Sequence, residues 1–387
     1  MSQLVYVERK GSDCNKWDGQ TTMFGEENLH AMWVADMDYK VPACVMDAMR
    51  AYVDFGVMGY YKIPQNYYDS FINWEKTYHG YEVKKEWMRF APGVVPAINW
   101  MLQMLTREND SVITLTPVYY PFLNAINNNK RKLIDCDLIN DHGVYSIDFE
   151  AFEKKIAAND VKAFILCSPH NPVARVWKKE ELARLMEICR KHHVYVISDE
   201  IHHDLTFGGH VHYPTATVGE YDDMLITVTA ATKTFNLAGC QNSIVVIPDE
   251  KLRGLWDAFT TNIRIVSGNA LGYIAVEAAY SKGRAWFEEL KQVVEGNAKY
   301  ASETLMKALP GVVVSPLEGT YLLWIDLGAY VKPEEIKEFM QGKCKLALDY
   351  GEWFGGERFG SFVRMNLATK RENVEIAVNR MIDGLKK

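Results

Sequence analysis

The chain has 387 residues, of which 48% are hydrophobic and 24% are charged, and its formal net charge is −7. This length allows two domains and a large buried core, and the composition is that of an ordinary soluble globular protein. The negative balance and the lack of a long Lys/Arg run argue against a nucleic-acid partner, which usually meets a basic face. The amino terminus lacks the apolar core of a signal peptide, and no apolar stretch reaches about 18 residues. We therefore expect a cytoplasmic protein without a membrane partner.

The cysteines and histidines do not form metal-binding motifs. The seven cysteines are scattered singly, without a CxxC pair, which indicates reduced thiols. The histidines include two adjacent pairs, His192-His193 and His202-His203, rather than the i, i+4 spacing of a helical metal site. We therefore predict no metal.

Two helices are predicted before the first strand. A helical pattern runs from Pro42 through Val53, and a second covers residues 66–79 and buries Phe71 and Trp74. The preceding residues, up to about 40, are mixed and aromatic and predict no clear element.

Strand-like and helix-like segments then alternate. The strands are near-continuous apolar runs, which suits a sheet covered on both faces, and such alternation implies a mostly parallel α/β sheet. The predicted strands are residues 87–90, 112–115, 132–136, 163–167, 195–198, 224–228 and 243–247. The predicted helices are residues 95–105, 121–127, 149–157, 179–192 and 251–261.

The pattern changes after residue 272. Residues 273–309 are helical with few interruptions, which suits one helix that ends the first domain and another that leaves it. The rest indicates a smaller α+β domain, with strands at 312–314, 321–326 and 362–367 and helices at 332–341 and 371–385. We predict a large domain over residues 46–285, a small domain over 286–387, and an N-terminal segment, 1–45, that joins the small domain.

Small and polar residues follow five of the predicted strands. Open α/β sheets bind ligands outside the carboxyl ends of their strands, so a site is expected at these positions. They are the Gly93-Val94-Val95 turn, Tyr119, Asn171, Asp199 and the Thr232-Lys233 pair. Together they offer backbone donors, an aromatic ring, an amide, a carboxylate and an amine, which indicates a binding site of mixed polarity.

Each of these residues has an ordinary explanation when taken alone. A lysine after a strand is usually a solvated surface charge, Gly93 is usually a turn glycine, and Tyr119 is more often a core residue. Asp199 is harder to explain, because it follows an apolar strand and an unpaired buried charge is very costly. The Gly93 turn has neither a GxGxxG nor a Walker A pattern, which disfavours dinucleotide and ATP binding.

One cofactor, pyridoxal phosphate, uses all five groups. It needs a lysine for covalent attachment and an acid beside its ring nitrogen, and helix N-terminal N–H groups can hold its phosphate. Asp199 would keep the ring nitrogen protonated, with an attraction of roughly 5 kcal/mol at about 3 Å and an effective dielectric near 20. Lys233 would serve first as the attachment point and then as the general base.

Several segments resemble the fold-type I pyridoxal-phosphate enzymes. The similarity is strongest to the cystathionine β-lyase branch related to aminotransferases, the C–S lyases of the MalY/PatB type, and it covers essentially the whole chain. It implies an α/β fold with a large domain built on a mostly parallel mixed sheet flanked by helices, and a smaller α+β domain. The segments are MWVADMDY (32–39), FAPGVVPAI (90–98), TPVYYPF (116–122), CSPHNPVARVW (167–177), SDEIHHDL (198–205), ATKTFNLAG (231–239), EGTYLLWID (318–326) and FVRMNLAT (362–369).

The resemblance assigns roles to individual residues. Lys233 matches the lysine that binds the cofactor, Asp199 the partner of its ring nitrogen, and Asn171 the donor to its phenolic oxygen. Tyr119 matches the ring that stacks on the cofactor. Arg364 matches the arginine that binds the substrate α-carboxylate, with Asn171 beside it, and its planar fork suits that task. The other matches are Val94 and Val95, whose N–H groups face the phosphate, Thr232, which adds a hydroxyl, and Ile201 and His202, which lie near the opposite side of the site.

Two positions depart from the broader fold-type I pattern. Many aminotransferases have an arginine eight residues after the lysine, where this chain has Gln241, and a serine three residues before it, where this chain has Ala230. Gln241 resembles the lyase branch and leaves the phosphate in need of another donor. Tyr60, or its neighbour Tyr61, matches a tyrosine that reaches the phosphate from the other subunit, which implies a homodimer.

The resemblance implies β-elimination on a small sulfur amino acid such as cystathionine, cysteine or cystine, giving a thiol, pyruvate and ammonia. An aminotransferase shares the early steps, and a lyase with an additional regulatory, protein-binding role is a further alternative. Four aromatic residues can either line the distal pocket or pack in the core: Trp33, Tyr119, Tyr120 and Tyr350. The sequence does not distinguish these two placements.

Overall fold

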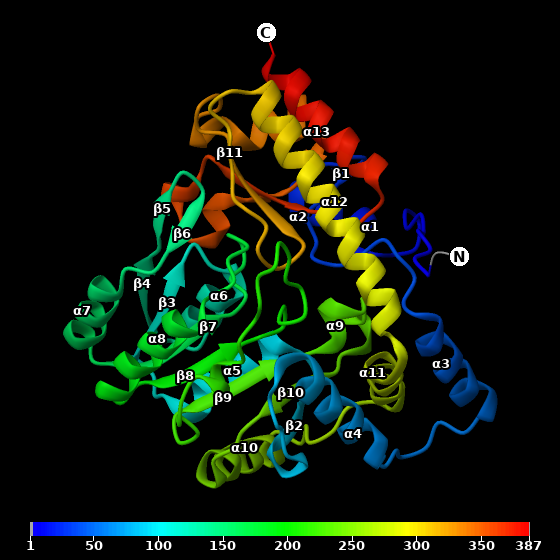
Figure 1. Cartoon of the computed structure of the whole chain (residues 1–387), viewed down its shortest axis with the longest axis vertical. Coiled ribbons are helices and arrows are strands. Elements are labelled where there is room, and N and C mark those ends of the chain that lie inside the picture. The colour runs from blue at the N-terminus through cyan, green and yellow to red at the C-terminus, as the bar shows by residue number, and fades with distance from the viewer. Residues whose placement is uncertain (1–2, 387) are drawn as a thin grey trace.

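A seven-stranded sheet forms the centre of the lower half of the molecule in Figure 1. The computed structural model describes residues 3–386. The strand order is β2-β10-β9-β8-β7-β3-β4. The strands are β2 (Met88–Ala91), β3 (Ser111–Thr116), β4 (Lys132–Asp137), β7 (Val161–Cys167), β8 (Tyr195–Asp199), β9 (Leu225–Thr229) and β10 (Ser243–Val246).

The direction of β10 differs from that of its neighbours. Strands β9, β8, β7, β3 and β4 pair in parallel, whereas β10 pairs antiparallel with both β9 and β2. The carboxyl ends of the parallel strands and of β2 therefore meet at one edge, together with Ser243, the first residue of β10. The mostly parallel mixed sheet predicted from the sequence is confirmed.

Helices cover both faces of this sheet. Neighbouring residues of a strand point to opposite faces, so each face forms its own apolar core. Val112 packs in one core with α5, α6 and α10, and Ile113 packs in another with α7 and α8. These helices are α5 (Val94–Leu105), α6 (Tyr120–Asn128), α7 (Phe149–Asn159), α8 (Lys179–Lys191) and α10 (Glu250–Asn262). Both ends of each helix lie within two residues of their predicted positions.

A second, antiparallel sheet lies in the upper half of Figure 1, beside two long helices. Its order is β11-β12-β15-β14, with β11 (Val313–Val314), β12 (Leu322–Asp326), β14 (Asp349–Tyr350) and β15 (Phe362–Asn366). Helix α11 (Ala270–Lys282) is followed by α12 (Arg284–Ala308), and α12 runs up to pack on α13 (Arg371–Leu385). The two predicted helices within residues 273–309 are thus present.

The N-terminal residues contact the C-terminal part of the chain. Strand β1 (His30–Ala31) pairs in parallel with β13 (Leu346–Ala347). The other N-terminal elements are α1 (Asn15–Asp18), α2 (Gln20–Phe24), α3 (Ala43–Phe55) and α4 (Gln65–Trp74), which continues as a π-helix over Glu75–His79, and a 3-10 turn at Lys85–Trp87. The predicted domain boundaries stay a prediction.

Three local features were not expected from the sequence. Residues 332–341, predicted as a helix, form a 3-10 turn at Pro333–Glu335 and a π-helix at Glu338–Lys343. A two-stranded hairpin, β5 (Ile139–Asp141) and β6 (Val144–Ser146), extends from the large sheet. The segment that carries Lys233 contains a short helix, α9 (Ala231–Thr234), for which no helix was predicted. Further short 3-10 turns are Thr215–Thr217, Ala238–Cys240, Gly351–Phe354 and Glu357–Phe359.

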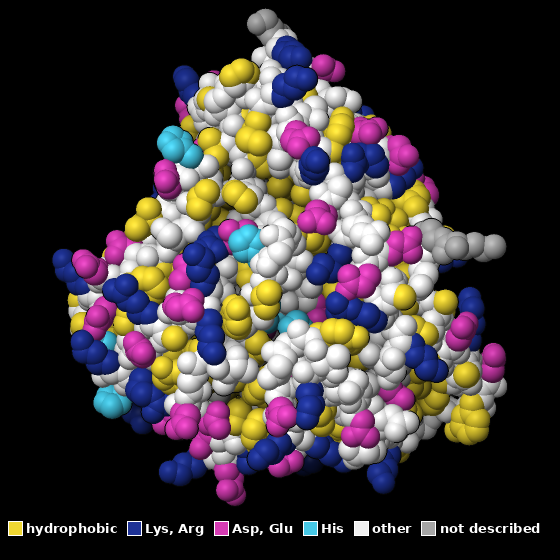
Figure 2. Space-filling model, viewed as in Figure 1, with side chains coloured by type: hydrophobic (Ala, Val, Ile, Leu, Met, Phe, Trp, Pro, Cys, Tyr) yellow, Lys and Arg dark blue, Asp and Glu magenta, His cyan; other side chains and the backbone are white. Residues whose placement is uncertain are grey.

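The surface carries charges of both signs. Lys/Arg and Asp/Glu side chains alternate over the face shown in Figure 2 without a large patch of one sign. Within residues 3–386, every helix is too short or too polar to cross a membrane.

Candidate active site

A cavity opens at the carboxyl edge of the large sheet, where the polar residues were predicted to meet. Most of the predicted residues line it, since parallel strands end side by side there. The lining residues are Ala35, Pro92, Gly93, Val94, Val95, Pro96, Tyr119, Cys167, Asn171, Asp199, Ile201, His202, Thr232, Lys233, Ala238, Gln241 and Ser243.

Lys233 enters the cavity from α9. Its Nζ donates a hydrogen bond to the backbone oxygen of Ala35 at 2.6 Å, and the hydroxyl of Tyr321 donates to the same oxygen at 2.8 Å. Burial lowers the pKa of Lys233 to about 8, against the opposing effect of Asp36. The amine is therefore able to lose its proton near neutral pH, as a nucleophile or a base requires.

The segment that carries Ala35 is fixed by two asparagines. The Asn236 side chain accepts from the N–H of Met37 at 3.0 Å and donates to the backbone oxygen of Met37 at 3.1 Å. The Asn366 amide donates to the backbone oxygen of Asp36 at 2.6 Å. These bonds bring the N-terminal segment over the lysine, a contact between residues almost 200 positions apart that no local pattern predicts.

Asp199 ends β8 and lines the cavity. The carboxylate is 3% exposed and its Oδ1 accepts a hydrogen bond from the N–H of Ile201 at 3.0 Å. Burial raises the pKa of Asp199 to about 7, although this hydrogen bond and the nearby Lys233 lower it. A cation placed beside this carboxylate would favour its ionised form.

The N-terminus of α5 supplies free backbone donors. Gly93 is the N-cap, and Val94 and Val95 follow it along the cavity wall. A Cβ at Gly93 would lie 3.2 Å from Cδ of Pro96, so the turn packs closely. Ser243, which pairs with Ala91 of β2 and also lines the cavity, has a buried hydroxyl without a hydrogen-bond partner. A helix N-terminus and a hydroxyl without a partner suit a phosphate group.

Asn171 and Arg364 lie on one side of the site. Nη1 of Arg364 donates to Oδ1 of Asn171 at 2.9 Å, and Nη2 contacts a carboxylate oxygen of Asp349. Arg364 is 2% exposed and stands behind Asn171, which itself lines the cavity. The structure thus brings the predicted carboxylate-binding pair together.

The remaining predicted residues differ in placement. Tyr119, Ile201, His202 and Thr232 line the cavity, and burial keeps the pKa of His202 well below its usual value, so the imidazole is neutral. Tyr60 is fully exposed and does not line the cavity of its own chain. Tyr61 instead stacks on Tyr273, with ring centroids 6.3 Å apart. Among the four aromatic candidates for the distal pocket, Tyr119 lines the cavity, whereas Trp33, Tyr120 and Tyr350 are not lining residues.

Sequence reasoning missed Ser243 and Ala35. Ser243 begins β10, and because β10 is antiparallel its first residue, not its last, lies at the cavity edge. A search of the residues that follow each strand therefore passes over it. The signal that could have found it is the short loop that joins Lys233 to this strand.

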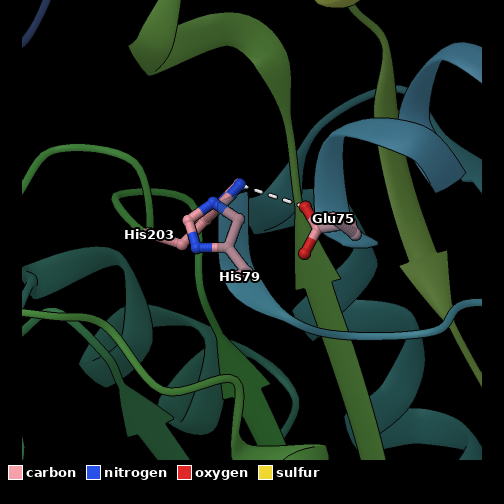
Figure 3. A group of neighbouring side chains, drawn as sticks. All are labelled: Glu75, His79 and His203. Atoms are coloured by element: carbon pink, nitrogen blue, oxygen red, sulfur yellow. Dashed lines mark ion pairs between the residues drawn. The ribbon is translucent and has the colours of Figure 1, made fainter. Parts of the chain in front are cut away.

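A buried cluster of charged side chains lies close to the lysine helix. In Figure 3 the ring of His203 points to Glu75, and the two are 3.2 Å apart, while His79 lies against His203 with ring centroids 4.6 Å apart. His79 is also 2.8 Å from Oδ1 of Asp204. Within residues 3–386 these three residues, Glu75, His79 and His203, form the group whose ligand atoms are close enough to hold a metal ion. Each also has a charged or hydrogen-bonding protein partner, so the expectation of no metal stays as it was.

The fold and the cavity define the class of protein. The family model for aminotransferases of class I and II matches residues 36–381, and the chain belongs to that family. It is 37% identical over 376 residues to cystathionine beta-lyase PatB of Bacillus subtilis, covering 97% of each chain.

Two solved structures superpose over nearly the whole chain. Cystalysin from Treponema denticola, which contains pyridoxal 5'-phosphate, has a TM-score of 0.95 and 33% identity and covers 99% of this chain and 98% of its own. A pyridoxal-phosphate-bound putative aminotransferase from Clostridium difficile has a TM-score of 0.95 and 40% identity and covers 99% of both chains. The family resemblance predicted from the sequence is confirmed.

Proposed function

We propose that this protein is a pyridoxal-phosphate-dependent C–S β-lyase that converts L-cystathionine and water into homocysteine, pyruvate and ammonia, and that it also acts on cysteine or cystine. The observation that carries the proposal is the meeting of Lys233, Asp199 and the N-terminus of α5 in one cavity. The similarity over 97% of both chains to a cystathionine β-lyase supports the choice of substrate.

The residues present fit this cofactor. The N–H groups at the start of α5, with Ser243, Thr232 and Gln241, would hold its phosphate, and Asp199 would pair with its ring nitrogen. Asn171 would donate to its phenolic oxygen and Tyr119 would cover its ring. When bound, pyridoxal phosphate supplies an electrophilic carbon for the substrate amine and accepts the electron pair that deprotonation of Cα releases.

Lys233 has the properties of the base in this reaction. With a pKa of about 8, its Nζ can accept the Cα proton and return it later, because a base works best when its pKa lies near the working pH. Arg364 and Asn171 would hold the substrate α-carboxylate and so place the Cα hydrogen toward this amine. Loss of the thiolate from Cβ then distinguishes a lyase from an aminotransferase.

The test is turnover of cystathionine by the purified, cofactor-loaded protein. We expect equal amounts of free thiol and pyruvate, and we expect Lys233→Ala to reduce the rate by at least about a hundredfold, the usual effect of losing a general base. Amino-group transfer to a keto acid without thiol release would establish an aminotransferase and refute the lyase.

We further propose that the active form is a homodimer, with Tyr60 reaching the partner's phosphate site. Tyr60 lies in a stretch whose large apolar side chains are exposed: Val53, Phe55, Val57 and Met58. Yellow hydrophobic side chains protrude where α3 ends at the right of Figure 2. Contiguous exposed apolar surface of this kind is typical of an interaction site.

A further inference from the structure

The guanidinium of Arg364 has a buried carboxylate partner as well as Asn171. Asp349 and Arg364 are opposite each other in the pairing of β14 with β15, and their side chains are 1% and 2% exposed. Phe354 covers the guanidinium, with its ring centroid 4.9 Å from Cζ. The contact between Asp349 and Arg364 is therefore built into the register of the sheet.

This buried pair is incompletely hydrogen-bonded. Oδ1 of Asp349 and Nε of Arg364 are both buried and have no hydrogen-bond partner, and each such group costs free energy. Burial raises the pKa of Asp349 to about 6, even though Arg364 lowers it. The carboxylate of Asp349 therefore takes up a proton at a pH only slightly below neutral.

We propose that Asp349 sets the affinity of the site for amino acids, because its carboxylate shares the single positive charge of Arg364 with the α-carboxylate of the substrate. This inference rests on the proposed function, since it takes Arg364 as the α-carboxylate-binding residue. Two carboxylates beside one cation repel each other. Substrate binding therefore favours the protonated form of Asp349, and ionised Asp349 weakens binding.

Other titratable groups near the pair do not replace Asp349 in this role. They are Tyr119, Tyr120, Tyr321, Tyr350, His202 and Lys233. Burial raises the pKa of each phenol and lowers that of His202, so these five are neutral at pH 7. Lys233 is displaced from the cofactor by α-aminoisobutyrate and by isopropylamine alike, so its titration cancels when the two amines are compared.

The experiment measures binding without turnover. Holoenzyme is titrated with α-aminoisobutyrate, which has no α-hydrogen, and with isopropylamine, which is the same amine without the carboxylate; the cofactor absorbance reports binding. For Asp349→Asn at pH 7.5 we expect the Kd for α-aminoisobutyrate to fall by about tenfold or more, the effect of removing one nearby like charge. The Kd for isopropylamine should stay the same. Calorimetry of α-aminoisobutyrate binding in two buffers should show that the variant takes up fewer protons on binding than the wild type does.

Asp326→Asn is the matched control. Asp326 lies on β12 of the same sheet and bonds to Ser361, so this variant should bind both compounds as the wild type does. An unchanged or higher Kd of Asp349→Asn for α-aminoisobutyrate, or an equal gain for isopropylamine, overturns the inference.

Two further measurements keep the inference testable. If Asp349→Asn does not fold, the same titrations of the wild type at several pH values test the inference. The ratio of the Kd for α-aminoisobutyrate to the Kd for isopropylamine should rise several-fold from pH 6 to pH 8. A ratio that does not change with pH overturns the inference. Arg364→Gln tests the underlying assignment separately. If that variant binds α-aminoisobutyrate as tightly as the wild type, the proposed role of Arg364 is wrong, whatever Asp349 does.

Discussion

Lys233, which is half-buried, and the buried Asp199 line the same cavity, and desolvation moves the pKa of each toward neutrality. The amine of Lys233 has its pKa lowered to about 8 and the carboxyl of Asp199 has its pKa raised to about 7. Shifts of this kind in a cavity are typical of functional groups. They also have a thermodynamic consequence, because a group whose pKa differs between folded and unfolded states makes stability depend on pH.

We predict that Asp199→Asn stabilises the cofactor-free protein more at pH 8 than at pH 5. The carboxyl has a pKa near 3.9 when unfolded and about 7 when folded, so the unfolded state releases its proton first as the pH rises. The wild type therefore loses stability through this range, and asparagine does not. Urea unfolding should show a change in the stability difference of about 2 kcal/mol between the two pH values.

An equal stability difference at pH 5 and pH 8 would show that the pKa of Asp199 is not raised in the fold. Loss of the proposed lyase activity in the same variant is expected as well, since asparagine would not keep the ring nitrogen of the cofactor protonated.

At the scale of elements, α9 is attached to the N-terminal helices through Asp204. Its Oδ2 accepts from the hydroxyl of Thr234, next to Lys233, at 2.6 Å, and its Oδ1 accepts from Nε1 of Trp74 at 2.8 Å. Burial would lower the pKa of His203, but Asp204 and Glu75 raise it to about 10, so its ring is protonated and pairs with both. The lysine helix is thus held by a buried network from α4 and the turn after β8.

We predict that Asp204→Asn lowers the free energy of unfolding by about 3–5 kcal/mol, the usual cost of breaking a buried ion pair from one side. The control is Asp257→Asn, which removes the half-exposed partner of Arg89 and should cost at most about 1 kcal/mol. Chemical denaturation of both variants measures the two effects. Equal costs would mean that the buried network adds no stability beyond that of a surface pair.

At the scale of the molecule, residues 53–60 form a stretch of chain that one subunit alone leaves uncovered. Residues 53–60 include side chains with large exposed fractions, among them Phe55 at 71% and Met58 at 60%. A second copy that covers this stretch would bury the apolar side chains, and in the proposed dimer it would bring Tyr60 to the neighbouring site. Assembly and catalysis would then depend on each other.

We predict that Val57→Asp weakens the dimer by about 3 kcal/mol, or roughly a hundredfold in Kd, because the interface would bury an unpaired charge. Val144→Asp is the matched control, since Val144 on the β5–β6 hairpin is similarly exposed, at 50% against 59% for Val57. Light scattering after size-exclusion chromatography measures the mass of each variant. A wild-type mass that corresponds to one chain, or equal behaviour of both variants, would contradict the dimer.

The sequence predicted the layers of the fold and most residues of the cavity. Apolar runs such as 163–167 predicted buried strands, and each strand's carboxyl end then placed Asn171 and Asp199 on one edge. The helix expected over residues 332–341 was wrong because two short turns of different pitch replace it. A hydrophobic pattern alone does not separate these from an α-helix.

By itself, the sequence determined the family, the mostly parallel sheet and the segments that surround Lys233, because short-range patterns and motifs record strand ends and turns. Only the tertiary structure decided that β10 runs antiparallel and places Ser243 at the cavity. It also decided that Ala35 accepts a hydrogen bond from Lys233 and that Asp349 pairs with Arg364. These depend on strand direction, register and contacts between distant segments, which packing of the whole chain sets. Lys233 was identified by its neighbours in sequence, but its lowered pKa comes from the burial that the complete fold provides.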